Sequence, residues 1–158
     1  MALIIENGSL VTGANSYITV DGWKSWMDDR NISHTNSDSK IEGAIMRAMD
    51  YFESLHFVGE KHEDTQALQW PRDYVYIDGY SIESDEIPKE VKAAMYEATK
   101  MELDGDSPIK EQGRATVSEK IGDIQVTYKG NAGMRKTTPA FTHAVRKLIH
   151  GRNSVIRA

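Results

Sequence analysis

The 158-residue sequence contains no cysteine. This absence excludes disulfide bonds, thiolate metal ligands and cysteine nucleophiles. No apolar run approaches the roughly 20 residues that span a bilayer. The first residues also lack the basic region and long apolar stretch of a signal peptide. We therefore expect a chain that is made in the cytoplasm and has no membrane partner.

Sequence patterns of catalysis are also missing. Neither a Walker phosphate loop nor a G-x-G-x-x-G turn occurs. His56 and His62 straddle a predicted helix end, so solvation or capping is favoured over metal binding. The acidic stretch 83–86 resembles a cation site, but carboxylates just before a helix are explained by the helix dipole. We expect a non-enzymatic protein without a metal or cofactor.

Charge is divided unevenly along the chain, although its net value is only −5. Residues 1–109 carry 9 Lys/Arg against 21 Asp/Glu, whereas residues 110–158 carry 10 Lys/Arg against 3 Asp/Glu. Such asymmetry suggests that the two parts meet different partners, or that copies pack basic end to acidic body. A solvated surface with unevenly distributed charges is the simpler alternative. Most nucleic-acid binders are basic overall, and this chain is not.

Apolar residues at three-and-four spacing predict four helices. The first is short and follows Thr19, which is a candidate N-cap. The second runs from Asp38 to near Gly59, the third from Pro88 to near Gly105, and the fourth from Pro139 to near Gly151. These elements predict a mainly α fold, a small helical bundle.

Alternating residues on either side of Gly-Asp at 122–123 predict a β-hairpin over about 116–128. An isolated hairpin is marginal in water, so this one should pack on the helices or pair with a neighbouring chain. Its candidate contacts between subunits are Val117, Ile121, Ile124, Val126 and Tyr128. A smaller hairpin or ordered loop is expected around Asp78-Gly79.

The chain divides into three predicted regions. Residues 1–15, rich in Gly, Asn, Ser and Thr, are expected to form an extended N-terminal arm. Residues 16–151 form the helical domain, with the hairpin inserted at 114–130. Residues 152–158 form a basic C-terminal tail, which is the second extended arm.

Aromatic residues offer one candidate nucleic-acid site. Trp23, Trp26, Trp70, Tyr74 and Tyr76 could stack on the bases of a single strand. Their sequence neighbours are acidic, however, whereas a nucleic-acid site needs Lys or Arg interleaved with its rings. We therefore expect these rings to pack in the core or in an interface.

Several segments in a fixed order resemble a phage protein family that is often labelled DnaT-like single-stranded-DNA-binding. Its members resemble head-completion or head-tail connector (adaptor) proteins. Leu-Gln-Trp-Pro-Arg at 68–72 and the following Ile-Pro helix start at 87–88 are the most specific part. The remaining segments are 14–17, 47–51 and 118–128.

The connector resemblance implies a virion structural subunit in the phage neck. Such subunits assemble as a ring, usually twelvefold, between the portal protein and a tail, stopper or terminator protein. Packaged DNA would pass through the lumen without specific binding. The candidates for docking on the portal are Arg146, Lys147, Arg152, Val155, Ile156 and Arg157. The alternative is a single-stranded-DNA-binding replication accessory protein, which charge near the aromatic rings would distinguish.

Overall fold

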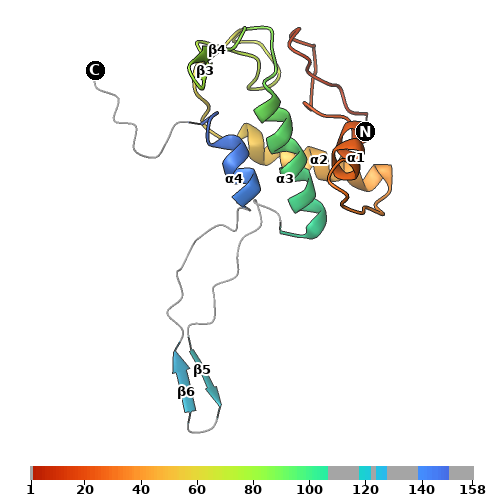
Figure 1. Ribbon diagram of the computed structural model, residues 1–158, viewed down its shortest axis with the longest axis vertical. Helices are drawn as coiled ribbons and strands as arrows, with labels where there is room; N and C mark the ends of the chain where they lie inside the picture. The colour runs from red at the N-terminus through yellow and green to blue at the C-terminus, as the bar shows by residue number, and fades with distance from the viewer. Residues whose placement is uncertain (1, 107–117, 122–123, 128–138, 150–158) are drawn as a thin grey trace, which may run out of the picture.

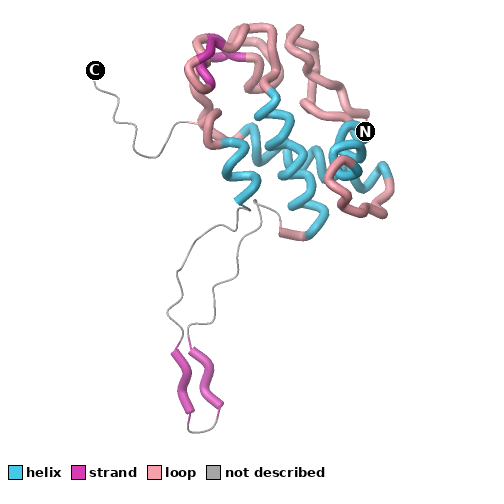
Figure 2. Tube along the Cα trace, in the orientation of Figure 1, coloured by secondary structure: helices cyan, strands magenta, loops and turns pink. Residues whose placement is uncertain are grey.

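The computed structural model describes residues 2–106, 118–121, 124–127 and 139–149. Within these residues it contains four helices and three two-stranded antiparallel pairs, a small mixed fold of helices and hairpins (Figure 1). Figure 2 shows loop segments gathered at the end of the helices where α3 begins. None of the described helices is long and apolar enough to cross a membrane.

Helix α1 (Val20–Asp28) begins where the sequence predicts. The hydroxyl of Thr19 accepts a hydrogen bond from the backbone N–H of Gly22 at 2.9 Å, which satisfies one of the free donors of the first turn. Trp23 and Trp26 are buried on the inner face of this helix. Both tryptophans therefore belong to the core, as expected.

Helices α2 (Asp38–Glu53) and α3 (Lys89–Asp104) form the centre of the fold. Each buries alanines and larger apolar side chains along one stripe, and the two helices pack against each other. An ion pair between Arg47 Nε and Glu102 Oε2, at 2.9 Å, joins them at one edge. Gly105 ends α3 in the left-handed region at φ 80°, as predicted from its position.

Helix α2 ends earlier than the sequence predicts, at Glu53 rather than near Gly59. A long-range contact keeps the helix from reaching Gly59. Phe57 forms an antiparallel bridge with Ile149, and the N–H of Val58 donates to the carbonyl of Leu148 at 2.9 Å. Backbone groups that pair with a distant segment cannot also extend the helix.

Helix α4 (Pro139–Val145) starts at the predicted proline and lies beside α3 (Figure 1). Phe141 and Val145 are buried, and the ring of Phe141 lies 5.5 Å from that of Tyr51. The helix stops six residues short of Gly151, and Leu148, which was predicted to lie on its apolar side, is buried in the turn that follows. Gly151 itself lies outside the described residues.

The three strand pairs are short. β1 (Glu60–Lys61) pairs with β2 (Arg72–Asp73), and β3 (Tyr76–Ile77) pairs with β4 (Tyr80–Ser81). The predicted larger hairpin is present as β5 (Ser118–Ile121) and β6 (Ile124–Thr127). Its register pairs Ile121 with Ile124, as a two-residue connection requires.

The N-terminal segment differs from the expected extended arm. Glu6 is buried, and its carboxylate accepts hydrogen bonds from the backbone N–H groups of Gly8, Leu10 and Val11 at 2.8–3.1 Å. Ile5 also bridges to Ser16. A carboxylate that gathers three donors closes residues 6–11 into a loop. The predicted C-terminal tail, 152–158, lies outside the described residues.

Candidate functional site

Three tyrosines on and beside the β3–β4 hairpin are the most exposed aromatic side chains described. Tyr74, Tyr76 and Tyr80 are 75%, 65% and 79% exposed, and Ile4 is the only other exposed large apolar residue in the described ranges. Of the two expected placements, core or interface, the core is therefore wrong for Tyr74 and Tyr76, and the interface stays a prediction. Exposed apolar groups that gather in one place mark an interaction surface.

The hairpin turn is built from Asp78 and Gly79, which have φ values of 52° and 86°. Two successive residues in the left-handed region form the turn that matches the twist of a short hairpin. Ile77 is buried and fixes the hairpin on the core. Because strand neighbours alternate between faces, Tyr76 and Tyr80 lie on opposite faces of the ribbon.

Arg72 holds the chain that leads into the hairpin. It is only 8% exposed, and its guanidinium donates to the carbonyls of Val58 and Gly59 at 2.8 and 2.7 Å. It also donates to the side-chain oxygen of Gln69 at 2.9 Å. The fork of an arginine suits several fixed acceptors at once. This side chain therefore closes the loop between β1 and β2.

A second buried group supports the same loop. The hydroxyl of Tyr17 donates to Glu53 Oε1 at 2.8 Å and accepts from the N–H of Trp70 at 3.0 Å. The other oxygen of Glu53 accepts from the N–H of Gln69 at 2.8 Å. Desolvation raises the pKa of Glu53, and desolvation together with the Glu53 charge raises the pKa of Tyr17.

Two adjoining hollows lie beside the start of α3, one of about 370 Å³ at the hairpin and one of about 360 Å³ at α4. They share Lys89 and Glu90 at the start of α3. The hollow at the hairpin is also lined by Ile77, Asp78, Tyr80, Ile82, Glu86 and Pro88. The hollow at α4 is also lined by Ala93, His143, Ala144 and Lys147. The two hollows meet at Lys89 and Glu90, and we refer to them together as the tyrosine–lysine groove.

Lys147 bridges the two ends of this groove. It follows α4 in the sequence, yet its ammonium group forms an ion pair with Asp78 at the hairpin turn, 69 residues away. The sequence separates the exposed rings from the basic C-terminal third, and folding brings them together. Arg146 is exposed in the same turn.

The other predicted docking residues, Arg152, Val155, Ile156 and Arg157, lie outside the described residues, as do Val117 and Tyr128 of the hairpin. Ile121, Ile124 and Val126 lie in β5 and β6. Their proposed roles stay predictions. The sequence feature that could have revealed the groove is the tyrosine spacing around Asp78-Gly79.

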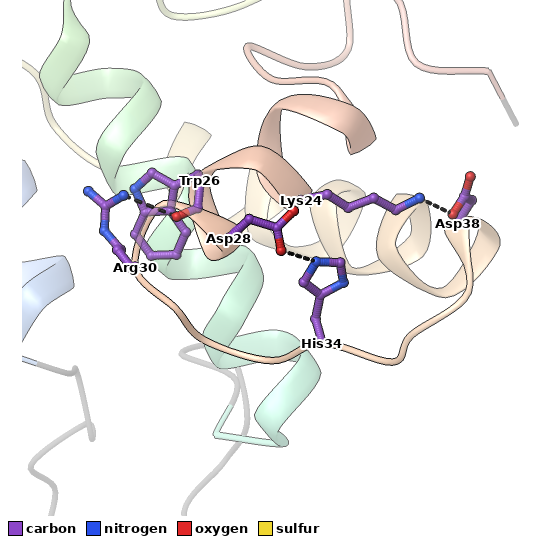
Figure 3. Close-up of polar contacts among 6 residues, drawn as sticks. All are labelled: Lys24, Trp26, Asp28, Arg30, His34 and Asp38. Carbon is purple, nitrogen blue, oxygen red and sulfur yellow. Dashed lines mark hydrogen bonds and ion pairs between the residues drawn. The ribbon is translucent and has the colours of Figure 1, made fainter.

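A second cluster of aromatic and charged groups surrounds α1 (Figure 3). The guanidinium of Arg30 lies 4.1 Å from the centre of the Trp26 ring and donates to the Trp26 carbonyl. Lys24 pairs with Asp38 at 2.6 Å, and His34 contacts Asp28 at 3.2 Å. These groups satisfy one another, and Trp26 offers only 9% of its surface. The cluster is therefore a weaker candidate than the groove.

No group of three metal-ligating side chains occurs in the part of the chain that the structure describes. The acidic stretch at 83–86 precedes α3, where a helix dipole favours negative charge. The described residues contain exposed tyrosine rings and a groove lined by two lysines, Lys89 and Lys147. These features suit binding.

Comparison with known proteins gives one result. A family model described as "Putative DnaT-like ssDNA binding protein" matches residues 1–158. No curated protein matches the chain significantly, and neither does any solved structure.

This match corrects the expected function. The head-tail connector reading, with its portal, neck and twelvefold ring, finds no support, and the family description agrees with the alternative instead. The sequence resemblance was correct for the family label and wrong for the structural role attached to it. With its whole length matched, the chain belongs to the family of putative DnaT-like single-stranded-DNA-binding proteins.

Proposed function

We propose that this protein binds single-stranded DNA, without catalysing a reaction, through the exposed tyrosines of the β3–β4 hairpin. The exposure of Tyr74, Tyr76 and Tyr80 carries the proposal. Bases in a single strand present their flat faces, and stacking on an aromatic ring contributes about 1–3 kcal/mol per base with little regard to sequence. Paired bases in a duplex are already stacked, so single strands should be preferred.

The charges near the rings are consistent with this role. Lys89 and Lys147 line the groove that begins at Tyr80. Lysines beside the rings can contact the phosphates of the strand, although the chain as a whole is acidic. Since the chain carries a net charge of −5, binding should be modest in affinity and sensitive to salt. The scaffold that carries the site is mainly helical.

Fluorescence anisotropy with a labelled oligothymidine, alone and annealed to its complement, tests the proposal. The wild-type protein should bind the single strand more tightly than the duplex. Replacing all three tyrosines by serine should remove most of this binding, because no ring remains for stacking. The substituted side chains are exposed, so circular dichroism should show an unchanged fold.

Ile4→Ser is the matched control. It removes an exposed apolar side chain, 42% accessible, from the N-terminal segment rather than the hairpin. Binding should be unaffected. Equal affinity for single and double strands, or a triple variant that binds like the wild type, would overturn the proposal.

A further inference from the structure

We infer that the tyrosine–lysine groove holds the phosphodiester backbone of the strand. In the free protein the carboxylate of Asp78 pairs with Lys147, and a phosphate of the bound strand takes the place of that carboxylate. This inference rests on the proposed function and assigns its backbone contacts. A base would stack on Tyr80 at one end of the groove, while Lys89 and Lys147 would contact the phosphates that follow.

The arrangement of the two lysines is the first observation. Lys89 lies at the start of α3 and lines both hollows, and Lys147 lines the hollow beside α4. Lys89 is exposed and has no ion-pair partner among the described residues. Two cations on one groove that begins at an exposed ring match the combination typical of single-strand sites.

The second observation is the ion pair of Lys147 with Asp78. Both side chains remain accessible, at 37% and 63% exposed. An exposed ion pair is weak because water competes with both partners. A phosphate oxygen can therefore take the place of the aspartate carboxylate at little cost. Asp78 then acts as an internal competitor for the lysine.

Glu86 and Glu90 also line the groove and oppose a phosphate. Their presence explains why both lysines would be needed, and why releasing one of them should have a measurable effect. Because Asp78 pairs with Lys147, removing the negative charge at Asp78 should increase the affinity for single-stranded DNA. Few structural roles of an aspartate would give this sign.

Asp78→Asn is the decisive variant. Asn tolerates the left-handed backbone at this position, where φ is 52°, and Asn-Gly suits the same turn. We expect single-strand binding to tighten about two- to fivefold, the range that an exposed ion pair allows. Anisotropy titrations of an oligothymidine at low salt measure the change.

Asp38→Asn is the matched control. Asp38 is 68% exposed and pairs with a lysine, Lys24, at 2.6 Å, but it lies at the start of α2 near α1 (Figure 3). The substitution changes the net charge by the same amount and also frees a lysine. It should leave binding unchanged. An equal gain from both variants would show that only net charge matters, and would overturn the groove assignment.

A double substitution identifies the lysine. In a Lys147→Gln background, the gain from Asp78→Asn should fall to less than half, because there is no cation left to release. Lys147→Gln and Lys89→Gln should each weaken binding and lower the salt dependence of log K by about 0.7, the value for one phosphate contact on a single strand.

The outcomes separate the two proposals. If the wild type fails to bind single strands, both the function and the groove are wrong. If the tyrosine variant loses binding but the variants of Asp78, Lys89 and Lys147 bind like the wild type, the function stands and the groove assignment fails. Circular dichroism on every variant confirms that the compared proteins are folded.

Discussion

The hydroxyl of Tyr17 donates to the carboxylate of Glu53 at 2.8 Å, joining two residues that are 36 apart in the sequence. The same hydroxyl accepts from the backbone of Trp70, and Glu53 accepts from Gln69. The buried Tyr17 and the partly buried Glu53 therefore tie together the segment before α1, the end of α2 and the loop that leads to the hairpin.

Stability should depend on pH through Glu53. Desolvation raises the pKa of this carboxyl above its ordinary value of 4.5, so the native state holds the proton more tightly than the unfolded chain does. The contribution of Glu53 is complete below pH 4.5 and is lost as pH rises through the raised pKa. The free energy of unfolding, measured in urea at a series of pH values, should fall less steeply with rising pH in Glu53→Gln than in the wild type. Identical slopes in the two proteins would contradict the assignment.

Removing the Tyr17 hydroxyl should destabilise the protein. Tyr17→Phe leaves the N–H of Trp70 buried without its acceptor and removes one donor to Glu53. We expect a loss of about 1–3 kcal/mol in the free energy of unfolding, measured in urea. Tyr76→Phe is the control, because its side chain is 65% exposed, and it should change stability by less than about 0.5 kcal/mol.

Gly59 should tolerate no side chain. Its φ is +71°, and an added Cβ would overlap the backbone oxygen of Asp73 and approach Val75 Cγ2 to 2.7 Å. Gly13 has nearly the same φ, +72°, but open space around it. Gly13→Ala should cost about 1–2 kcal/mol from the backbone conformation alone. Gly59→Ala should cost about 1–3 kcal/mol more. Equal thermal and urea stabilities would show that the loop can move away.

The tyrosines should differ in their importance for binding. Tyr80 lines the groove, whereas Tyr76 lies on the other face of the hairpin. Tyr80→Ala should weaken single-strand binding by about 1–3 kcal/mol, and by more than Tyr76→Ala does. Tyr80→Phe keeps the ring and should retain most of the affinity. A Tyr80→Phe variant as weak as Tyr80→Ala would show that the hydroxyl, not stacking, provides the contact.

Local chemistry in the sequence was sufficient to predict several elements. Thr19 caps α1, Pro88 precedes α3 and Gly105 ends it. The Asp78-Gly79 turn lies between β3 and β4. Each of these features depends on side-chain hydrogen bonding or on the backbone angles that one residue allows. Such preferences act over a few residues and can be seen without the fold.

The candidate site could be predicted only in part. Tyr74 and Tyr76 were visible as aromatic residues, but their acidic neighbours in the sequence favoured packing in the core or in an interface over a nucleic-acid site. The sequence could not show that Lys147 lies beside Asp78, because that contact depends on how α4 packs on α3. None of the segments that resemble the family contains a binding or catalytic motif. They therefore indicated the family but not what the protein does.

The sequence by itself therefore determined the four helices and the β3–β4 and β5–β6 hairpins, since periodicity, caps and turns are local properties. It did not predict the pairing of β1 with β2. The tertiary structure decided which surfaces face each other. It paired Phe57 with Ile149, so that α2 does not extend to Gly59. It also left Tyr80 exposed next to two lysines. These outcomes depend on packing between distant segments, where many weak contacts together outweigh the preference of any one residue.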